Sequence, residues 1–212
     1  TCAVIIEPIQ GESGILPATQ EYLQAARRLC DKHGALLILD EVQTGMGHTG
    51  KLFAYEHYGV TPDILSSAKA LGGGFPIGAI LTTDKIAPTF GPGTHGSTFG
   101  GNPMACAVGS RAFDIINAPE TLAHVKQQGQ KLQTALREIG EKTGVFKEVR
   151  GMGLLLGCVL ADEYAGKASE ITAAALKHGL MVLVAGANVV RFAPSLLLND
   201  EDMAEGLKRF EA

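Results

Sequence analysis

The sequence predicts an α/β protein in which a mostly parallel sheet with flanking helices is followed by a small C-terminal α+β domain. Three observations predict this fold class. An unbroken apolar run at 35–39 stops abruptly at Asp40, as is typical of a strand buried on both faces of a parallel sheet. A helical pattern separates this run from an earlier apolar run at 2–6. Beyond residue 145, short strand patterns alternate with short helical ones.

The first helix has clear boundaries in the sequence. The strand pattern at 2–6 ends in an acid, Glu7, and a glycine-punctuated loop at 10–14 follows. Thr19 is a suitable N-cap for a helix that extends to His33, and Gly34 is placed to end it. This order completes a strand–helix–strand unit.

The rest of the chain divides into a sheet-forming part and a smaller domain. We expect 1–118 to belong to a large domain, 119–144 to form a linking helix and 145–212 to form a small domain. The expected strands are 63–65, 77–82, 145–149, 154–160, 181–184 and 189–192, and the expected helices are 103–116, 119–142, 169–178 and 200–210.

Composition excludes several classes of protein. The chain has 212 residues with a formal charge of −4 and no basic run, which argues against a nucleic-acid surface. Four scattered cysteines without a Cys-x-x-Cys pair indicate a reducing compartment and no zinc site, and the six histidines show no metal-ligand spacing. No signal peptide or membrane-spanning run is visible, so we expect a cytoplasmic protein without membrane or nucleic-acid partners.

An acid and a lysine follow two of the predicted strands. Asp40 ends the run at 35–39, and Lys69 comes shortly after the apolar burst at 63–65. Ligands of open α/β sheets bind at the carboxyl ends of strands. Pyridoxal phosphate needs a lysine amine for its Schiff base and an acid on its ring nitrogen. A capping role for Asp40 or a solvated surface role for Lys69 is the alternative, but the glycines at 72–74 favour close approach of a bulky cofactor.

Five motifs resemble one known family. They are EPIQGE at 7–12, LDEVQTG at 39–45, SAKALGGG at 67–74, GSTFGGNP at 96–103 and VRFAP at 190–194. In this order they resemble the class III aminotransferases, in particular the acetylornithine and succinylornithine aminotransferases, and the resemblance covers essentially the whole chain. Members of the family are roughly twice this long, so we expect the chain to correspond to their C-terminal half. His48 and Ser13 depart from the family pattern, which usually has arginine and glycine there.

The resemblance implies a fold-type I pyridoxal-phosphate enzyme that acts as a homodimer. Lys69 would form the Schiff base and move the substrate proton, while Asp40 would keep the ring nitrogen protonated. The resemblance places Val42 on the ring face and Gln43 near the ring hydroxyl. It also implies that Ser97 and Thr98 bind the cofactor, with Thr98 serving the phosphate of the neighbouring subunit.

The resemblance also points to a substrate site. Arg191 lies in an apolar strand, and its guanidinium suits a substrate carboxylate, with a structural ion pair as the alternative. The resemblance implies that Glu7 pairs with Arg191 when the amino donor is an ω-amine and moves away for glutamate.

Several functions stay open at this point. The implied reaction is transamination of N-acetylornithine or N-succinylornithine with 2-oxoglutarate, and the sequence does not distinguish the two acyl groups. Ornithine or 4-aminobutyrate transamination and a non-catalytic fragment are the alternatives. The Ser-x-x-Lys pattern at 66–69 lacks the partner motifs of penicillin-recognising enzymes, and no Gly-x-Gly-x-x-Gly turn indicates a dinucleotide fold.

Overall fold

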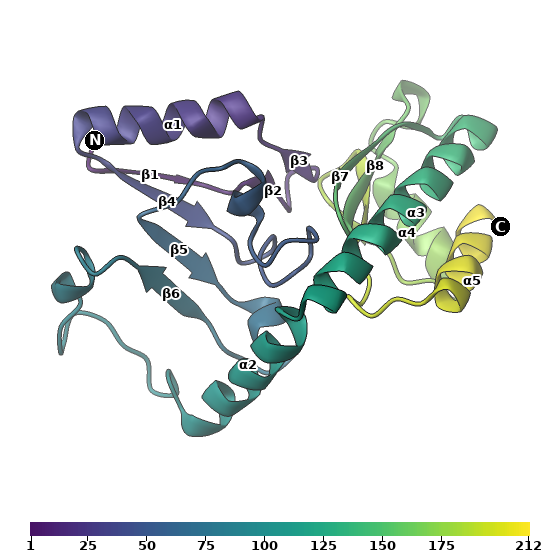
Figure 1. Ribbon diagram of the computed structural model, residues 1–212. Helices are drawn as coiled ribbons and strands as arrows, with labels where there is room; N and C mark the ends of the chain where they lie inside the picture. Colours follow the sequence, from purple (N-terminus) through teal and green to yellow (C-terminus); the bar gives the residue numbers. More distant parts are fainter. The chain divides into compact units, whose positions relative to one another are not determined.

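The structure, a computed structural model, describes residues 1–212, which form two compact units (Figure 1). The first unit contains Thr1–Pro8, Ala18–Gly47 and Lys51–Ala118, and the second contains Ile9–Pro17, His48–Gly50 and Pro119–Ala212. The extent of the units differs from the division expected from the sequence. The helix expected to link two domains packs inside the second unit, which also takes in two short segments from the first half of the chain.

The first unit is built on a four-stranded mixed sheet with the order β1-β4-β5-β6. Strands β1 (Ala3–Ile6), β4 (Leu36–Asp40) and β5 (Ile64–Ser67) are parallel, and β6 (Ala79–Thr82) runs antiparallel at the edge. The mostly parallel sheet expected from the sequence is therefore confirmed. The short 3-10 helices η1 (Ala54–His57) and η2 (Lys69–Gly72) lie between the strands, and η3 (Ala87–Thr89) follows β6.

Helix α1 (Gln20–His33) covers one face of this sheet, as Figure 1 shows. The Thr19 hydroxyl accepts a hydrogen bond from the Tyr22 N–H at 3.2 Å, and Gly34 ends the helix in the left-handed conformation. Both expected boundaries are confirmed. Leu37 and Leu39 are fully buried, whereas the alternate residues Ile38 and Asp40 are only partly buried, so β4 has unequal faces. Helix α2 (Pro103–Ile116) completes the unit and is capped by Asn102.

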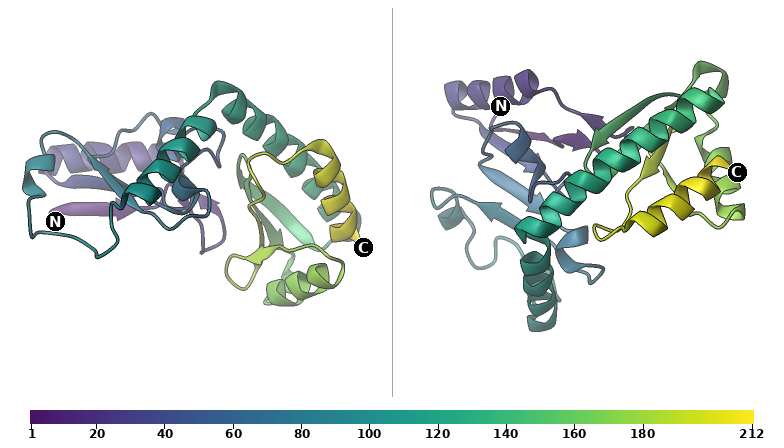
Figure 2. Two further views of the ribbon diagram at one scale, coloured as in Figure 1. Left: turned by 90° about the horizontal axis from the view of Figure 1, so that it is seen from below. Right: turned by 45° about the vertical axis from the view of Figure 1, so that its right-hand side comes forward.

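The second unit contains a four-stranded antiparallel sheet with the order β7-β8-β10-β9. Its strands are β7 (Phe146–Met152), β8 (Leu155–Leu160), β10 (Val189–Phe192) and β9 (Leu183–Val184). One face carries helices α3 (Pro119–Thr143), α4 (Ala168–Lys177) and α5 (Asp200–Glu211), and Figure 2 shows α3 and α5 beside each other. The short 3-10 helix η4 (Asp162–Tyr164) precedes α4.

A small hairpin covers the other face of the second sheet. Its strands β2 (Ile9–Gln10) and β3 (Leu16–Pro17) flank the turn at 11–14, where the sequence predicted only a loop. Ile9 and Ile15 are fully buried in a cluster with Leu155, Val159 and Val189 of the sheet. The second sheet is therefore covered on both faces. No helix of the chain is long and apolar enough to cross a membrane.

Candidate active site

Asp40 is fixed at the carboxyl end of β4. Its Oδ1 accepts hydrogen bonds from the Val42 N–H and the Ser66 hydroxyl, both at 3.0 Å. Both bonds use the same oxygen, and Oδ2 accepts none. Asp40 therefore has one oxygen that positions the side chain and one that is available to a donor group of a ligand.

Glu41, the next residue, is turned into the protein. It is only 1% exposed, and its carboxylate accepts hydrogen bonds from the Thr44 hydroxyl at 2.7 Å and from the Ala54 and Tyr55 N–H groups at 2.8 and 2.7 Å. Burial raises the pKa of Glu41, against the three hydrogen bonds, which lower it. Glu41 ties the segment after Asp40 to the start of η1. This role of Glu41 was not predicted from the sequence, where the only signal is an acid next to another acid at a strand end.

Lys69 has an unusual backbone conformation. It is exposed at the start of η2 and has a φ of 47°, the left-handed region that a long side chain rarely adopts. Such strain is concentrated at functional sites, where the surrounding structure enforces it. Gly73 and Gly74 follow with φ of 55° and 106°, so the chain turns sharply just after the lysine.

Asp40 and Lys69 lie at the same edge of the sheet. Strands β4 and β5 are parallel neighbours, Asp40 pairs with Ser66 in register, and Lys69 comes three residues after Ser66. The structure therefore brings together the two residues on which the sequence analysis depended. Val42 and Gln43, both partly buried, form the turn directly after Asp40 and Glu41. Glu7 is partly buried just after the end of β1.

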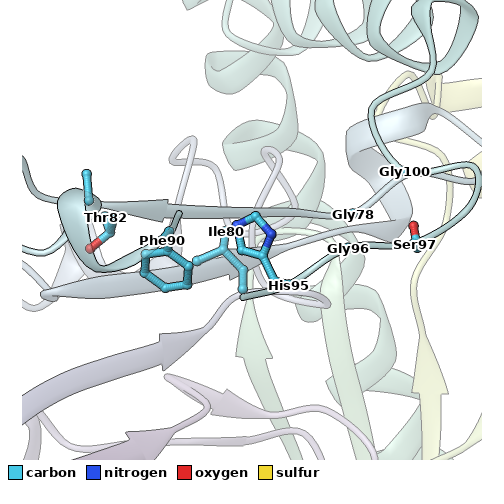
Figure 3. A pocket seen from close by; sticks show the side chains of 9 residues that line it. Gly78, Ile80, Thr82, Phe90, His95, Gly96, Ser97 and Gly100 are labelled. Atoms are coloured by element: carbon cyan, nitrogen blue, oxygen red, sulfur yellow. The ribbon is translucent and has the colours of Figure 1, made fainter. Parts of the chain in front are cut away.

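Ser97 lines a hollow on the face of the sheet that carries Asp40. Register places Asp40, Ser66 and Ile80 side by side on β4, β5 and β6, hence on one face. A hollow of about 700 Å³ lies over Ile80 and is bounded by the loop that includes Phe90, His95 and Ser97 (Figure 3). The ring centroids of Phe90 and His95 are 5.5 Å apart. Thr98, next to Ser97, is exposed.

The second unit holds Arg191 in an ion pair with Glu12. Arg191 Nη1 lies 2.7 Å from Glu12 Oε1. The pair forms because 9–17 folds as a hairpin over the sheet that contains β10, and Glu12 lies in its turn. The pairing of Arg191 with Glu7 that the resemblance implies stays a prediction. The arginine side chain is 12% exposed and the glutamate side chain 68%, so the pair is open to solvent on one side.

The donor set at this sheet edge fits pyridoxal phosphate. No group of three or more histidine, cysteine, aspartate or glutamate side chains is arranged to hold a metal ion. The open Asp40 Oδ2 is an acceptor suited to a protonated ring nitrogen, and Lys69 supplies an amine at the same sheet edge. A mixed α/β sheet with these two groups at its carboxyl edge is the arrangement expected of a fold-type I domain that holds pyridoxal phosphate.

Comparison with known proteins identifies the family. Residues 1–212 match the aminotransferase class-III family, and the chain belongs to it. It is 82% identical to the acetylornithine aminotransferase of Neisseria meningitidis serogroup B, over all of this chain and 53% of that protein. It is 60% identical to the succinylornithine transaminase of Citrobacter koseri, over 99% of this chain and 52% of that protein.

A solved structure shares the fold. The crystal structure of N-acetylornithine aminotransferase from Stenotrophomonas maltophilia matches with a TM-score of 0.91 at 48% identity, over 99% of this chain and 55% of that one. The chain thus spans about half the length of the relatives that it matches.

Proposed function

We propose that the chain belongs to an enzyme that transfers the amino group of N-acetylornithine or N-succinylornithine to 2-oxoglutarate, which gives a semialdehyde and glutamate. The observation that carries the proposal is the strained Lys69 at the same sheet edge as the open oxygen of Asp40. The high identity to enzymes named for acylated ornithines supports these substrates over ornithine or 4-aminobutyrate.

The residues of the first unit would hold the cofactor. Lys69 Nζ would bind pyridoxal phosphate covalently, and Asp40 Oδ2 would accept the hydrogen bond of its ring nitrogen. Val42 and Gln43 would contact the ring, and Ser97 and Thr98 the phosphate. When bound, the cofactor supplies an electron sink for the carbon that bears the substrate amine.

Lys69 and Asp40 would then have separate tasks. Lys69 Nζ would take a proton from the amine-bearing carbon of the substrate as a general base and deliver a proton as a general acid. Asp40 would favour a positive charge on the ring nitrogen, because an opposite charge nearby favours the charged form.

Arg191 would receive a carboxylate of the substrate. Its guanidinium is preorganised in β10 and matches a carboxylate in a bidentate fork. The resemblance implies a switch role for Glu7, and we propose that Glu12 shares this role, because Glu12 forms an ion pair with Arg191. Glu12 would neutralise Arg191 for the ω-amine donor and move away for 2-oxoglutarate and glutamate.

We further propose a homodimer in the cytoplasm. The loop that carries Thr98 exposes Phe99 to 82% and precedes Met104, which is 67% exposed, so apolar side chains are available for a second subunit. In this arrangement Thr98 would reach the neighbouring subunit's cofactor. All four cysteines are free thiols, which suits a reducing compartment.

Chemical trapping tests the assignment of Lys69. Borohydride reduction of the holoenzyme should leave the pyridoxyl group on the peptide that contains Lys69, as mass spectrometry of the digest would show. Label on Lys51 or Lys85 instead would refute the assignment.

The role of Asp40 is tested by Asp40→Asn. This variant should retain the cofactor but turn over about one to two decades more slowly, the equivalent of ~1.5–3 kcal/mol for a lost charged hydrogen bond. Near-normal turnover would show that Asp40 does not act on the ring nitrogen.

A further inference from the structure

The turn that carries Glu12 is held at its other end by a second arginine. Arg150 of β7 donates a hydrogen bond from Nε to the Gly14 carbonyl oxygen at 2.9 Å. Glu12 itself pairs with Arg191 at 2.7 Å. The short turn at 11–14 is therefore held through a side chain at one end and through the backbone at the other.

The two arginines lie on the same face of the sheet. Register pairs Arg150 of β7 with Gly157 of β8, and Gly157 with Arg191 of β10, so the three residues form a row across adjacent strands. Residues opposite each other in a sheet project from the same face. The two guanidinium groups thus flank a glycine, directly under the hairpin.

Ile15 fills the space that this glycine leaves. A Cβ on Gly157 would lie 2.9 Å from the Ile15 Cβ, and a Cβ on Gly151 would lie 3.1 Å from the Ile15 Cγ2. Ile15 is fully buried and has a φ of 50°, a conformation that is a genuine outlier for a β-branched residue. Such a conformation persists only where the surroundings over-determine it. The turn is consequently built to be held in one position.

We infer that Arg150 is a positioning residue that keeps Glu12 on Arg191 and so sets how readily a carboxylate ligand replaces Glu12. This inference depends on the proposed function, in which Arg191 receives the substrate carboxylate. Because the Glu12 side chain is 68% exposed, solvent screens its ion pair with the 12% exposed Arg191 from one side, and the anchoring of the turn helps to decide how often Glu12 stays in place.

The inference has a definite direction. A ligand carboxylate and Glu12 compete for Arg191, so any change that loosens Glu12 lowers the cost of displacing it. Loss of Arg150 should therefore strengthen the binding of dicarboxylates and leave the chemical step intact. A residue needed only for folding would weaken binding or leave it unchanged.

The test uses glutarate, a dicarboxylate without the reacting keto group, as a probe of the holoenzyme. Arg150→Met keeps an unbranched apolar chain but removes the donor to Gly14. Calorimetry should show glutarate binding about two- to fivefold tighter than in the parent, the range expected for an exposed ion pair. The KM for 2-oxoglutarate should fall by a similar factor, with kcat unchanged.

Two further variants keep the test decisive. Arg150→Lys retains one donor group and should give an intermediate affinity for glutarate. If thermal unfolding shows that Arg150→Met does not fold, Arg150→Lys takes its place in the test. Glu148→Gln removes the carboxylate whose Oε2 lies 3.5 Å from Arg150 Nη1, and should leave glutarate affinity unchanged.

A double-variant cycle separates this mechanism from a general loosening of the fold. Glu12→Gln should tighten glutarate binding at least as much as Arg150→Met, and adding Arg150→Met to it should give no further gain. Independent, additive gains would overturn the inference, as would unchanged or weaker binding in folded Arg150→Met and Arg150→Lys. Failure of the proposed role of Arg191 would show separately, as glutarate affinity that is unaffected by Arg191→Ala.

Discussion

The two four-stranded sheets of the protein differ in how completely they are covered. All six residues of β8 in the second unit are buried between the helices on one face and the hairpin on the other. In the first unit, three of the four residues of β6 are exposed, and Ile5 and Ile80 on the face of Asp40 are 67% and 63% exposed.

The difference in coverage indicates different roles for the two sheets. In the second unit apolar contact fills both faces, so the sheet is a rigid base on which Arg191 and the hairpin turn are mounted. In the first unit, the sheet face that carries Asp40 is not covered by other side chains of the unit and is available to ligands. Stability should therefore depend mainly on the covered sheet, and chemistry on the bare one.

The largest loss of stability is expected from a change in the covered sheet. Leu156 is 1% exposed in the core formed with α3 and α5, and Leu156→Ala should reduce the free energy of unfolding by about 2–5 kcal/mol, because a cavity is left behind. Urea unfolding followed by circular dichroism measures it. A loss below about 1 kcal/mol would contradict the contrast between the sheets.

A smaller loss is expected at Glu41, the one buried carboxylate near the bare sheet. In Glu41→Gln, the amide nitrogen must face either the Ala54 or the Tyr55 N–H, since each carboxylate oxygen accepts one of these bonds. Leaving a buried donor unsatisfied costs roughly 1–3 kcal/mol. Glu138→Gln on the exposed side of α3 is the control and should change little. Equal changes in the free energy of unfolding for the two variants would show that the buried hydrogen bonds of Glu41 do not stabilise the fold.

The pH dependence of stability should separate Glu41 from Asp63. Burial raises the pKa of Asp63, but the Leu37 N–H bond and the Arg27 ion pair outweigh it and the pKa is lowered. Its contribution is present above the pKa of the unfolded chain and lost as pH falls through the lower folded pKa. Glu41 has the opposite sign: its raised pKa favours folding at low pH, and this contribution is lost as pH rises through the folded pKa.

Asp63→Asn makes this separation measurable. In this variant, the unfolding free energy should fall by about 1 kcal/mol less than in the parent as the pH is lowered. Unfolding free energies from urea titrations at a series of pH values would show the slope. An unchanged acid limb would mean that Asp63 is not the group responsible.

The smallest effect on stability is expected on the bare face. Ile80→Ser exposes no new core and should change the unfolding free energy by less than ~0.5 kcal/mol, while it reduces self-association of the apolar face. Urea unfolding and light scattering measure the two quantities. A loss comparable with that of Leu156→Ala would show that this face is packed after all.

The sequence was most informative where a local pattern determines a local structure. Thr19 and Gly34 bound α1 as expected, and the apolar runs that end in polar residues place Asp40 and Lys69 at one sheet edge. These features depend on helix caps and strand lengths, which residues close together in the sequence determine.

Tertiary contacts were beyond the sequence analysis. Glu12 and Arg191 are 179 positions apart, and the two-residue strands of the hairpin are too short to show a period. The left-handed conformation of Lys69 and the burial of Glu41 likewise result from the surrounding structure rather than from the residues themselves.

The adjacent acids at the end of β4 make the active site intolerant of insertions and deletions in that strand. Asp40 projects onto the face of Ser66, and Glu41 extends into a pocket of three hydrogen-bond donors. Removing one residue from β4 would bring Glu41 opposite Ser66 and place Val42, which has no acceptor in its side chain, among those donors. A single deletion would thus misplace the carboxylate and leave buried donors unpaired, so natural variation in length should be confined to the turns.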